Sequence, residues 1–338
     1  MSARESIIPV FVPHLGCPNN CVFCNQRRIS GSQQPATAQT VKDAIQQAAA
    51  LPHTGAKRQL AFYGGSFTAI PVDEQRALLA AAKEYIDSGE LSSIRLSTRP
   101  DAIDAEVLRR LKEYGVETIE LGAQSLCNEV LRLSGRGHSA EAVENASRLI
   151  KEAGFKLILQ MMTGLPGDSI ERSIETAERI IALKPDGVRI YPTVIVKDTA
   201  LYDMWQAGKY PEHSVVDAVK VCAKLLPLFE KENIPVIRLG LNPTEELSGG
   251  AAAAGAYHPA LGELVKSRIM YEKACEILSG AEPGSRIVLS VHPSKISQMT
   301  GQHRANIKAL CEMFSLAELK IKGNDGNNDE IAILSVEK

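Results

Sequence analysis

The stretch Cys17-Pro-Asn-Asn-Cys-Val-Phe-Cys24 directly follows an apolar run at residues 7–12 whose composition predicts a first β-strand. Three thiolates spaced C-x3-C-x2-C on one loop can hold three corners of a cubane iron–sulfur cluster, because soft sulfur ligands suit such centres. The fourth iron would have no protein ligand, and an open coordination site is a catalytic arrangement. Zinc with a distant fourth ligand, for which His14 is a candidate, is the simpler alternative.

The other four cysteines stand apart from one another, and the total of seven is odd. This distribution argues against a disulfide framework. We expect these four to be small buried hydrophobic residues in helices. They are Cys127, Cys222, Cys275 and Cys311.

The amino-acid composition and net charge exclude few classes of function. The formal charge of -2 neither suggests nor excludes a nucleic-acid partner, which would have to meet a local basic surface. The apolar run near the N-terminus is too short for a signal-peptide core, and no segment approaches the roughly 20 apolar residues of a membrane span. We therefore expect a cytoplasmic protein with no membrane association.

Apolar, β-branched stretches alternate with amphipathic helical stretches through the first 230 residues, which is the pattern of βα units on a parallel sheet. Six such units are fewer than the eight that close a barrel, so the sheet should stay open on one side. Strands are predicted at 7–12, 59–63, 93–98, 116–121, 156–161 and 187–191, and helices at 38–50, 73–87, 105–114, 140–153, 170–183 and 215–230.

The unusual residues fall in the loops that leave the carboxyl ends of these strands, where parallel βα folds carry their chemistry. Together these motifs resemble the radical S-adenosylmethionine (SAM) superfamily, and in particular the radical domain of the Elongator catalytic subunit. The likeness covers roughly residues 5–240. Its motifs, besides the cysteines, are Phe62-Tyr-Gly-Gly-Ser-Phe-Thr68, Ser97-Thr-Arg-Pro-Asp101, Gly122-Ala-Gln-Ser125, Arg189-Ile-Tyr-Pro-Thr193 and Leu201-Tyr-Asp-Met-Trp205.

The resemblance implies a partial (βα)6 TIM-like barrel and an enzyme with two cofactors, a [4Fe-4S] cluster on Cys17, Cys21 and Cys24, and SAM. In such enzymes the reduced cluster cleaves SAM to a 5'-deoxyadenosyl radical that abstracts hydrogen from the substrate. An electron donor such as flavodoxin or ferredoxin is implied as a partner. The cofactors carry the chemistry, and protein groups position them.

The cofactor-binding residues are carried over by position. Gly64, Gly65 and Ser66 match a Gly-Gly-acidic motif near the methionine amino group, with serine in place of the acid. Arg99 or Arg136 is expected to clamp the methionine carboxylate, and a buried structural ion pair is the alternative for either. The remaining expected positions are Thr98, Gln124, Ser125 and Gly164, with Tyr191 as a weak candidate for a catalytic residue.

Beyond residue 240 the pattern changes. We expect residues 241–284 to extend the barrel and link it to a small α/β unit at 285–338 with the order strand, helix, helix, strand, strand. Around Gly301-Gln-His-Arg304 this order resembles a minimal KH module, whose G-x-x-G loop contacts nucleic-acid backbones. Arg304 replaces the second glycine, so a purely structural cap is the alternative. The candidate RNA-binding residues are Lys295, His303, Arg304 and Lys308.

The resemblance favours RNA, most plausibly a tRNA base, as substrate. These 338 residues hold no counterpart of the Elongator acetyltransferase domain, so its carboxymethylation of wobble uridine cannot simply be carried over. A small-molecule radical enzyme similar to oxygen-independent coproporphyrinogen oxidase is the second hypothesis. A non-catalytic iron–sulfur or zinc protein is the third.

Overall fold

A computed structural model describes residues 5–12, 19–25, 35–51, 57–242, 247–324 and 330–337. Cys17 and His14 lie outside these ranges. The chain divides into two compact units, one formed by Met1–Ser214 with Leu225–Tyr257 and the other by Val215–Lys224 with His258–Lys338. Each unit is described separately. No described helix combines the length and the apolar character needed to cross a bilayer.

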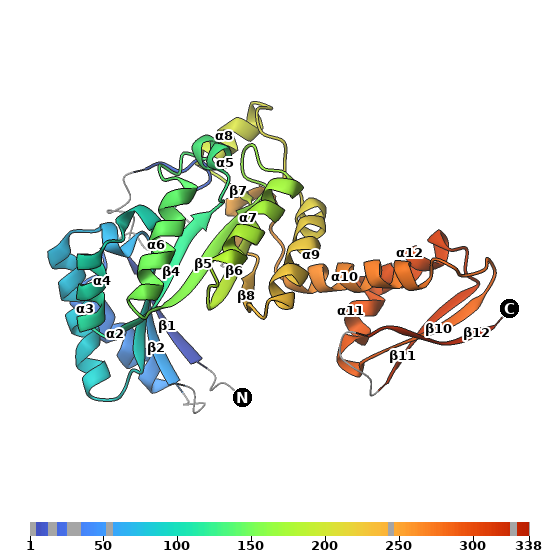
Figure 1. The fold of residues 1–338 in the computed structure, drawn as a ribbon, viewed down its shortest axis with the longest axis horizontal. Coiled ribbons are helices and arrows are strands. Elements are labelled where there is room, and N and C mark those ends of the chain that lie inside the picture. The colour runs from blue at the N-terminus through green and yellow to red at the C-terminus, as the bar shows by residue number, and fades with distance from the viewer. Residues whose placement is uncertain are drawn as a thin grey trace. The chain divides into compact units, whose positions relative to one another are not determined.

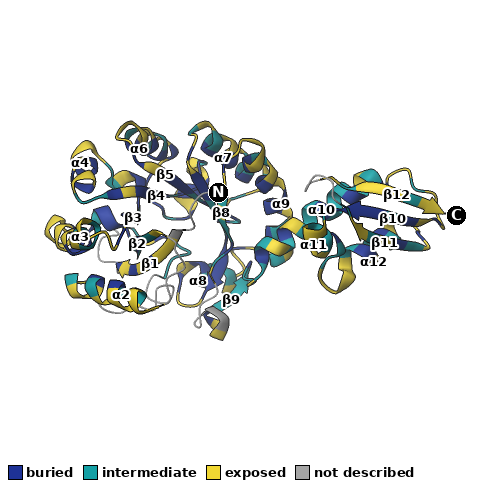
Figure 2. Ribbon diagram, turned by 90° about the horizontal axis from the view of Figure 1, so that it is seen from below, coloured by how far each residue is buried: buried dark blue, intermediate teal, exposed yellow. Residues whose placement is uncertain are grey.

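The first unit is built on a sheet of seven strands in the order β1-β2-β3-β4-β5-β6-β8, with every neighbouring pair parallel. The sheet curls into a half-barrel with helices on its outer side (Figures 1 and 2). This confirms the partial barrel. Its strands are β1 (Glu5–Val12), β2 (Lys57–Gly64), β3 (Ser93–Thr98), β4 (Val116–Gln124), β5 (Lys156–Thr163), β6 (Gly187–Pro192) and β8 (Val236–Leu239).

The seventh strand, β8, corrects the expectation of six. It is only four residues long, and all four are partly or fully exposed, so it lacks the buried apolar run by which the other strands were found. Its pairing with β6 shifts register between Val188 and Arg189.

The expected outer helices are present. Four begin at a capping side chain that accepts a backbone amide of the first turn, namely Thr37, Asp104, Ser139 and Ser169. The outer helices are α2 (Ala38–Ala50), α3 (Val72–Asp87), α4 (Ala105–Glu113), α6 (Ala140–Glu152) and α7 (Ile170–Ala182), and α9 (Val215–Lys231) follows them in the chain.

Side chains alternate along the strands, as the period of two requires. The apolar set, which includes Leu60, Ile94 and Ile119, is completely buried. Many of the intervening positions in the central strands carry polar groups, among them Glu120 of β4. Its carboxylate accepts hydrogen bonds from Arg95 Nη1 at 3.0 Å, Arg189 Nε at 2.8 Å and the Tyr63 hydroxyl at 3.0 Å. The charged and polar groups around Glu120 thus form hydrogen bonds with one another.

Smaller elements of the first unit were not predicted. They are α5 (Asn128–Leu133), α8 (Ala200–Gln206), β7 (Val194–Val196), β9 (Ala252–Gly255) and the short helical turns η2 (Phe67–Ala69), η3 (Pro100–Ala102) and η4 (Leu247–Ala251). Within the small-residue stretch at 249–255, the last four residues make strand β9 antiparallel to β7. Gly255 packs closely against the residue before β7, because a Cβ at this position would lie 2.9 Å from the Thr193 carbonyl oxygen.

In the second unit, residues 285–338 have the predicted order of strand, two helices and two strands, and a helix whose bounds were not predicted precedes them. β10 (Arg286–Val291) is the central strand, parallel to β11 (Glu318–Gly323) and antiparallel to β12 (Ala332–Glu337). Helices α10 (Leu261–Ile277), α11 (Ile296–Thr300) and α12 (Ala305–Met313), with turns η5 (Pro293–Lys295) and η6 (Gln302–Arg304), complete it. Its core joins Ile287, Leu289 and Val291 of the central strand to Met270 and Leu310 of the helices.

The four cysteines outside the motif were expected to be buried within helices, and the structure confirms this only in part. Cys222 is fully buried in α9, whereas Cys275 in α10 and Cys311 in α12 are half-buried. The expectation is wrong for Cys127, which stands at the N-cap of α5 rather than within a helix.

Candidate functional site

The second and third loops of the barrel are joined by hydroxyl groups. Ser66 Oγ lies 2.9 Å from Thr98 Oγ1 and accepts the Arg99 amide at 3.1 Å. Thr98 Oγ1 is also 2.6 Å from Thr68 Oγ1, whose hydroxyl donates to the Ala102 carbonyl at 2.6 Å. Because Ser66 and Thr98 are both 4% exposed, this chain of hydroxyls fixes one loop against the other.

The glycine pair lies against the end of β1. Gly64 has a φ of 98°, and a Cβ there would approach the Val12 carbonyl oxygen to 2.9 Å. The Gly65 amide donates to that same oxygen at 2.8 Å. Only glycine allows this approach at position 64, so the motif holds the end of the strand from which the cysteine segment continues.

The described part of the cysteine loop is anchored on both sides. The Val22 amide donates to the Ser134 carbonyl at 3.0 Å, and the Leu201 amide donates to the Val22 carbonyl at 2.7 Å. Val22 and Phe23 pack against a small core that includes Leu201 and Tyr210. The loop is therefore held between the end of α5 and the start of α8.

Two of the three motif cysteines can be placed. The Cys24 amide donates to the Cys21 carbonyl at 3.0 Å, so both thiols come from one tight turn, with Cys21 buried and Cys24 half-buried. Within the described ranges no three His, Cys, Asp or Glu side chains form a metal-binding group, since the third cysteine lies outside them. Two cysteines on one turn, of which Cys21 contacts the Arg136 guanidinium, suit a soft-metal centre.

The segment Gly135-Arg-Gly137 passes directly over the cysteine loop. A Cβ on Gly135 would lie 3.1 Å from the Asn20 carbonyl oxygen, and one on Gly137 would lie 2.4 Å from the Asn19 side-chain nitrogen. Their φ values of 65° and 72° also favour glycine. The two glycines thus allow Arg136 to approach the cysteines.

Arg136 is 7% exposed and aims its guanidinium at the loop. Nη1 donates to Cys21 Sγ at 3.5 Å, Nη2 to the Gly122 carbonyl at 2.6 Å and Nε to His138 Nε2 at 3.1 Å. An arginine has five N–H groups. Two of them, one on each terminal nitrogen, therefore have no acceptor among the described residues.

Arg99, the other candidate for a carboxylate clamp, is engaged in an ion pair. Its Nε donates to Asp101 Oδ1 at 2.9 Å and its Nη2 to Asp101 Oδ2 at 3.1 Å. Nη2 also donates to the Arg136 carbonyl at 2.6 Å. The structure thus shows an ion pair between buried Arg99 and exposed Asp101, and it makes Arg99 a support for the Arg136 backbone.

Gln124 joins this group, whereas Ser125 does not. A Cβ on Gly122 would lie 2.9 Å from Gln124 Nε2 and 3.2 Å from Arg136 Nη2, so both side chains converge over Gly122. Gln124 has a positive φ of 66° at a bulge in β4. Ser125 instead places its hydroxyl 3.3 Å from Thr176 of α7 and accepts the Cys127 amide at 3.1 Å.

Gly164 begins the fifth loop with a φ of 73°. Its amide donates to Asp168 Oδ2 at 2.8 Å, and its carbonyl accepts the Tyr210 hydroxyl. The ring of His213 occupies the space where a side chain at position 164 would lie. Sequence reasoning missed Tyr210 and His213, because they follow α8 in the chain and no local pattern marks them.

Tyr191, the weak catalytic candidate, is half-buried near the end of β6, with its hydroxyl 3.4 Å from Arg189 Nη1. It belongs with the polar network around Glu120, and within the described part of the chain it has no hydrogen bond to Arg136, Cys21 or Cys24. Nothing in this geometry distinguishes a catalytic role.

Burial and then the positive charge of Arg136 lower the pKa of His138 to about 4. The imidazole is therefore neutral in the folded protein at pH 7. Its Nε2 accepts from Arg136, so its proton lies on Nδ1, 3.2 Å from the Ser139 carbonyl oxygen.

This pKa predicts a loss of stability in mild acid. Above pH 6.5 His138 is neutral in both folded and unfolded chains, whereas between pH 6.5 and about 4 only the unfolded chain binds the proton. The free energy of unfolding should fall over that range by at most about 3 kcal/mol from this residue. Denaturant unfolding of the cluster-free protein at pH 7, 6, 5 and 4 should show a shallower decline for His138→Gln, and equal slopes would contradict the prediction.

The candidate RNA-binding residues lie together in the second unit. Lys295 ends η5, His303 and Arg304 form the turn before α12 with φ values of 51° and 61°, and Lys308 lies in the first turn of α12. His303, Arg304 and Lys308 are exposed. Within the described residues none of the four has an ion-pair partner.

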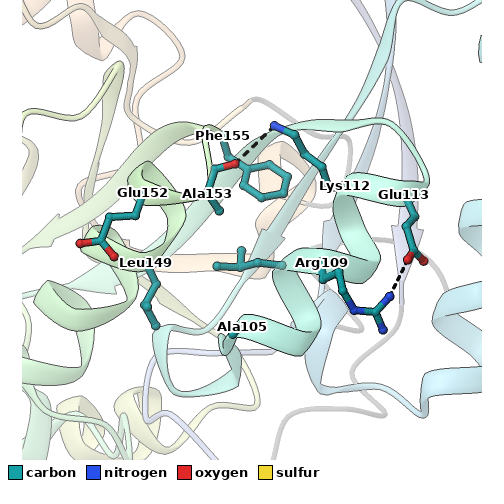
Figure 3. A pocket seen from close by; sticks show the side chains of 9 residues that line it. Ala105, Arg109, Lys112, Glu113, Leu149, Glu152, Ala153 and Phe155 are labelled. Carbon is teal, nitrogen blue, oxygen red and sulfur yellow. Dashed lines mark hydrogen bonds and ion pairs between the residues drawn. The ribbon is translucent and has the colours of Figure 1, made fainter.

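A groove between α4 and α6 lies on the outer helical layer, away from this site. Leu108, Leu149 and Phe155 line it, and Lys112 Nζ sits 4.8 Å from the centre of the Phe155 ring (Figure 3). None of its lining residues belongs to a strand-end loop.

A parallel half-barrel with a cysteine loop after its first strand, and with an arginine and a glutamine converging beside it, defines the class of radical enzymes that join an iron–sulfur cluster to SAM. The chain belongs to the radical SAM superfamily, whose profile matches residues 11–180, and the profile of the Radical_SAM C-terminal domain matches residues 185–271. Its cofactors are accordingly a [4Fe-4S] cluster and SAM.

Among individual proteins, the chain is similar to human Elongator complex protein 3, with 31% identity over 205 residues that cover 54% of this chain and 37% of that protein. It is 26% identical over 265 residues to the tRNA uridine(34) acetyltransferase of Methanocaldococcus infernus, covering 66% and 50%. The chain thus spans about half or less of the length of these relatives.

A solved structure of archaeal Elp3 from the same organism, with an N-terminal deletion, superimposes with a TM-score of 0.63 at 23% identity, covering 86% of this chain and 71% of the other. At that identity the likeness supports the fold.

Proposed function

We propose that this chain is a radical SAM enzyme that acts on RNA and that its target is a tRNA base. Binding of the two cofactors is supported by one observation, the convergence of Cys21, Arg136 and Gln124 at the carboxyl ends of the strands. The RNA side is supported by relatives named for Elongator and for acetylation of tRNA uridine, whose likeness runs through this barrel. The sheet does not close into a barrel, since β1 and β8 stand at its two edges, and an open side would suit a large substrate.

Each group in the site would have a separate task. When bound, the cluster and SAM supply a 5'-deoxyadenosyl radical that removes hydrogen from the substrate. Cys17, Cys21 and Cys24 would hold three irons. The two unassigned N–H groups of Arg136, one on each terminal nitrogen, suit bidentate binding of the methionine carboxylate, while Arg99 supports it from behind through the Arg136 carbonyl.

The other residues expected at the cofactor fall into two groups, those that would contact it and those that hold the loops. Gly64, Gly65 and Gly164 would bring the main chain close to the cofactor, and Gln124 would contribute a side-chain amide beside Arg136. Hydrogen bonds to neighbouring residues engage the hydroxyl groups of Ser66, Thr98 and Ser125. We propose that these three keep the loops in position.

The proposal is tested by anaerobic reconstitution with iron and sulfide followed by measurement of 5'-deoxyadenosine. A chemical reductant and flavodoxin serve as alternative electron sources. We expect the yield to rise when bulk tRNA is added. An increase with a porphyrinogen and none with tRNA would favour the small-molecule hypothesis, and no 5'-deoxyadenosine from cluster-loaded protein would contradict the enzyme itself.

The second unit offers a further prediction about RNA. Lys295, Arg304 and Lys308 present positive charge with no ion-pair partner among the described residues, and such charges attract phosphate in a salt-dependent way. Replacing all three with Gln should weaken tRNA binding uniformly across sequences and flatten its salt dependence.

The measurement is tRNA affinity by filter binding at several salt concentrations. The matched control replaces Lys266, Arg268 and Lys273 of α10, which removes equal charge from the same unit. Equal affinity and equal salt slope for the Lys295, Arg304 and Lys308 variant and the parent would reduce the unit to a structural cap.

A further inference from the structure

Arg136 makes a contact that the clamping of SAM does not require. Its Nη1 donates to Cys21 Sγ at 3.5 Å, an ordinary distance for a hydrogen bond to sulfur. Cys21 is 6% exposed and Arg136 is 7% exposed, so the contact is shielded from water. A cationic donor therefore touches a proposed cluster ligand directly.

We infer that Arg136 sets the reduction potential of the cluster through this N–H···S hydrogen bond, and that His138 is the positioning residue that aims it. The inference rests on the proposed function, because it takes Cys21 as a cluster ligand. It assigns His138 a role in electron transfer to the site, and it gives Arg136 a second role beside binding the carboxylate.

The direction of the effect follows from charge. Reduction adds an electron to the cluster, and part of the added negative charge falls on the ligand sulfurs. A hydrogen-bond donor to such a sulfur stabilises the reduced form and raises the potential. The positive charge of a buried guanidinium acts in the same direction, and low surrounding polarity strengthens both effects.

The geometry shows why His138 aims the donor. Its Nε2 accepts from Arg136 Nε at 3.1 Å, and the Gly122 carbonyl accepts from Nη2 at 2.6 Å. Two of the three guanidinium nitrogens are thereby fixed, which leaves Nη1 directed at Cys21. Arg99 holds the Arg136 carbonyl at 2.6 Å and so fixes the backbone as well.

Both ring nitrogens of His138 have hydrogen-bond partners, and this arrangement suits the positioning of Arg136. Because Nε2 must accept, the ring is neutral and its Nδ1 proton points to the Ser139 carbonyl oxygen at 3.2 Å. A second positive charge beside Arg136 is thus avoided. Glutamine can replace the acceptor at this position, since its side-chain oxygen accepts a hydrogen bond, whereas leucine cannot.

The test is the midpoint potential of the anaerobically reconstituted full chain, measured without SAM by a redox titration followed by electron paramagnetic resonance. We expect a more negative potential for His138→Leu than for the parent and a potential close to the parent for His138→Gln. Arg136→Lys, which keeps the charge but not the fixed N–H direction, should also be more negative. Arg132→Lys, an exposed neighbour, is the matched control and should not shift.

Iron content and thermal melting are measured on every variant. A His138→Leu protein with full iron content and the parent potential would overturn the inference. If that variant does not load iron, Arg136→Lys decides in its place, and the parent potential there would overturn it. A parent chain that never binds a cluster would count against the proposed function, whereas a loaded parent with unshifted variants would count only against this inference.

Discussion

Replacing Cys21 with Ala is expected to abolish cluster binding, and replacing Cys17 or Cys24 should do the same. Cys21 and Cys24 lie on one tight turn in which Val22 is hydrogen-bonded to both Ser134 and Leu201, so no other thiol among the described residues could take their place without moving the loop. A cubane missing one of three protein ligands has two irons without protein support. Iron and sulfide content and the visible spectrum after anaerobic reconstitution provide the measurement.

The control is Cys311→Ala, which removes a half-buried thiol from the second unit and should leave the spectrum unchanged. Four irons per chain and an unaltered spectrum in the variant lacking all three motif cysteines would show that the cluster is held elsewhere. Tetrahedral zinc in the parent, with no iron after reconstitution, would support the simpler metal-site reading of the same motif.

Replacing Arg136 with Gln is expected to weaken SAM binding by roughly 10- to 100-fold, because a charge-assisted bond to a carboxylate contributes about 1.5–3 kcal/mol. The cluster should still assemble, since the cysteines remain. Arg99→Gln should have a smaller effect, because Arg99 is paired with Asp101 and reaches the site through the Arg136 backbone.

Equilibrium dialysis of SAM against the loaded protein under anaerobic conditions measures both effects. Arg132→Lys is again the control, since its exposed side chain lies one turn before Arg136 on the same segment. A structure with SAM bound and both the Arg99 and Arg136 guanidinium groups directed away from its carboxylate would refute the clamp.

The sequence predicted those parts of the fold that a local pattern encodes. Strand β3 has the predicted bounds, because Ile94 and Leu96 alternate with polar residues as the period of a strand requires. Helix α2 also matches, since Thr37 forms a capping box that marks its start. Strand β8 was missed because a run of four residues is too short a signal, and its pairing with β6 is seen only in the structure.

The same limit applies to the site. The motif Gly135-Arg-Gly-His138 indicated an arginine near the cofactor, but no sequence pattern could reveal that its glycines make room for Asn19 and Asn20, far earlier in the chain. The engagement of Arg99 by Asp101, only two residues away, could be suspected from the sequence. The contacts of His213 and Tyr210 with the fifth loop depend on how α8 returns to the barrel, which is a tertiary outcome.

The central claim is that this chain removes hydrogen from RNA with a SAM-derived radical, and isotope transfer tests it most directly. The substrate is deuterated tRNA, prepared from cells that lack the gene for this chain and are grown in deuterated medium. It is incubated with the reconstituted enzyme in ordinary water, and the 5'-deoxyadenosine is analysed by mass spectrometry. The account predicts 5'-deoxyadenosine heavier by one deuterium, and none of that mass with the Cys21→Ala protein. Abundant 5'-deoxyadenosine that stays unlabelled with deuterated tRNA would contradict RNA as the source of the hydrogen.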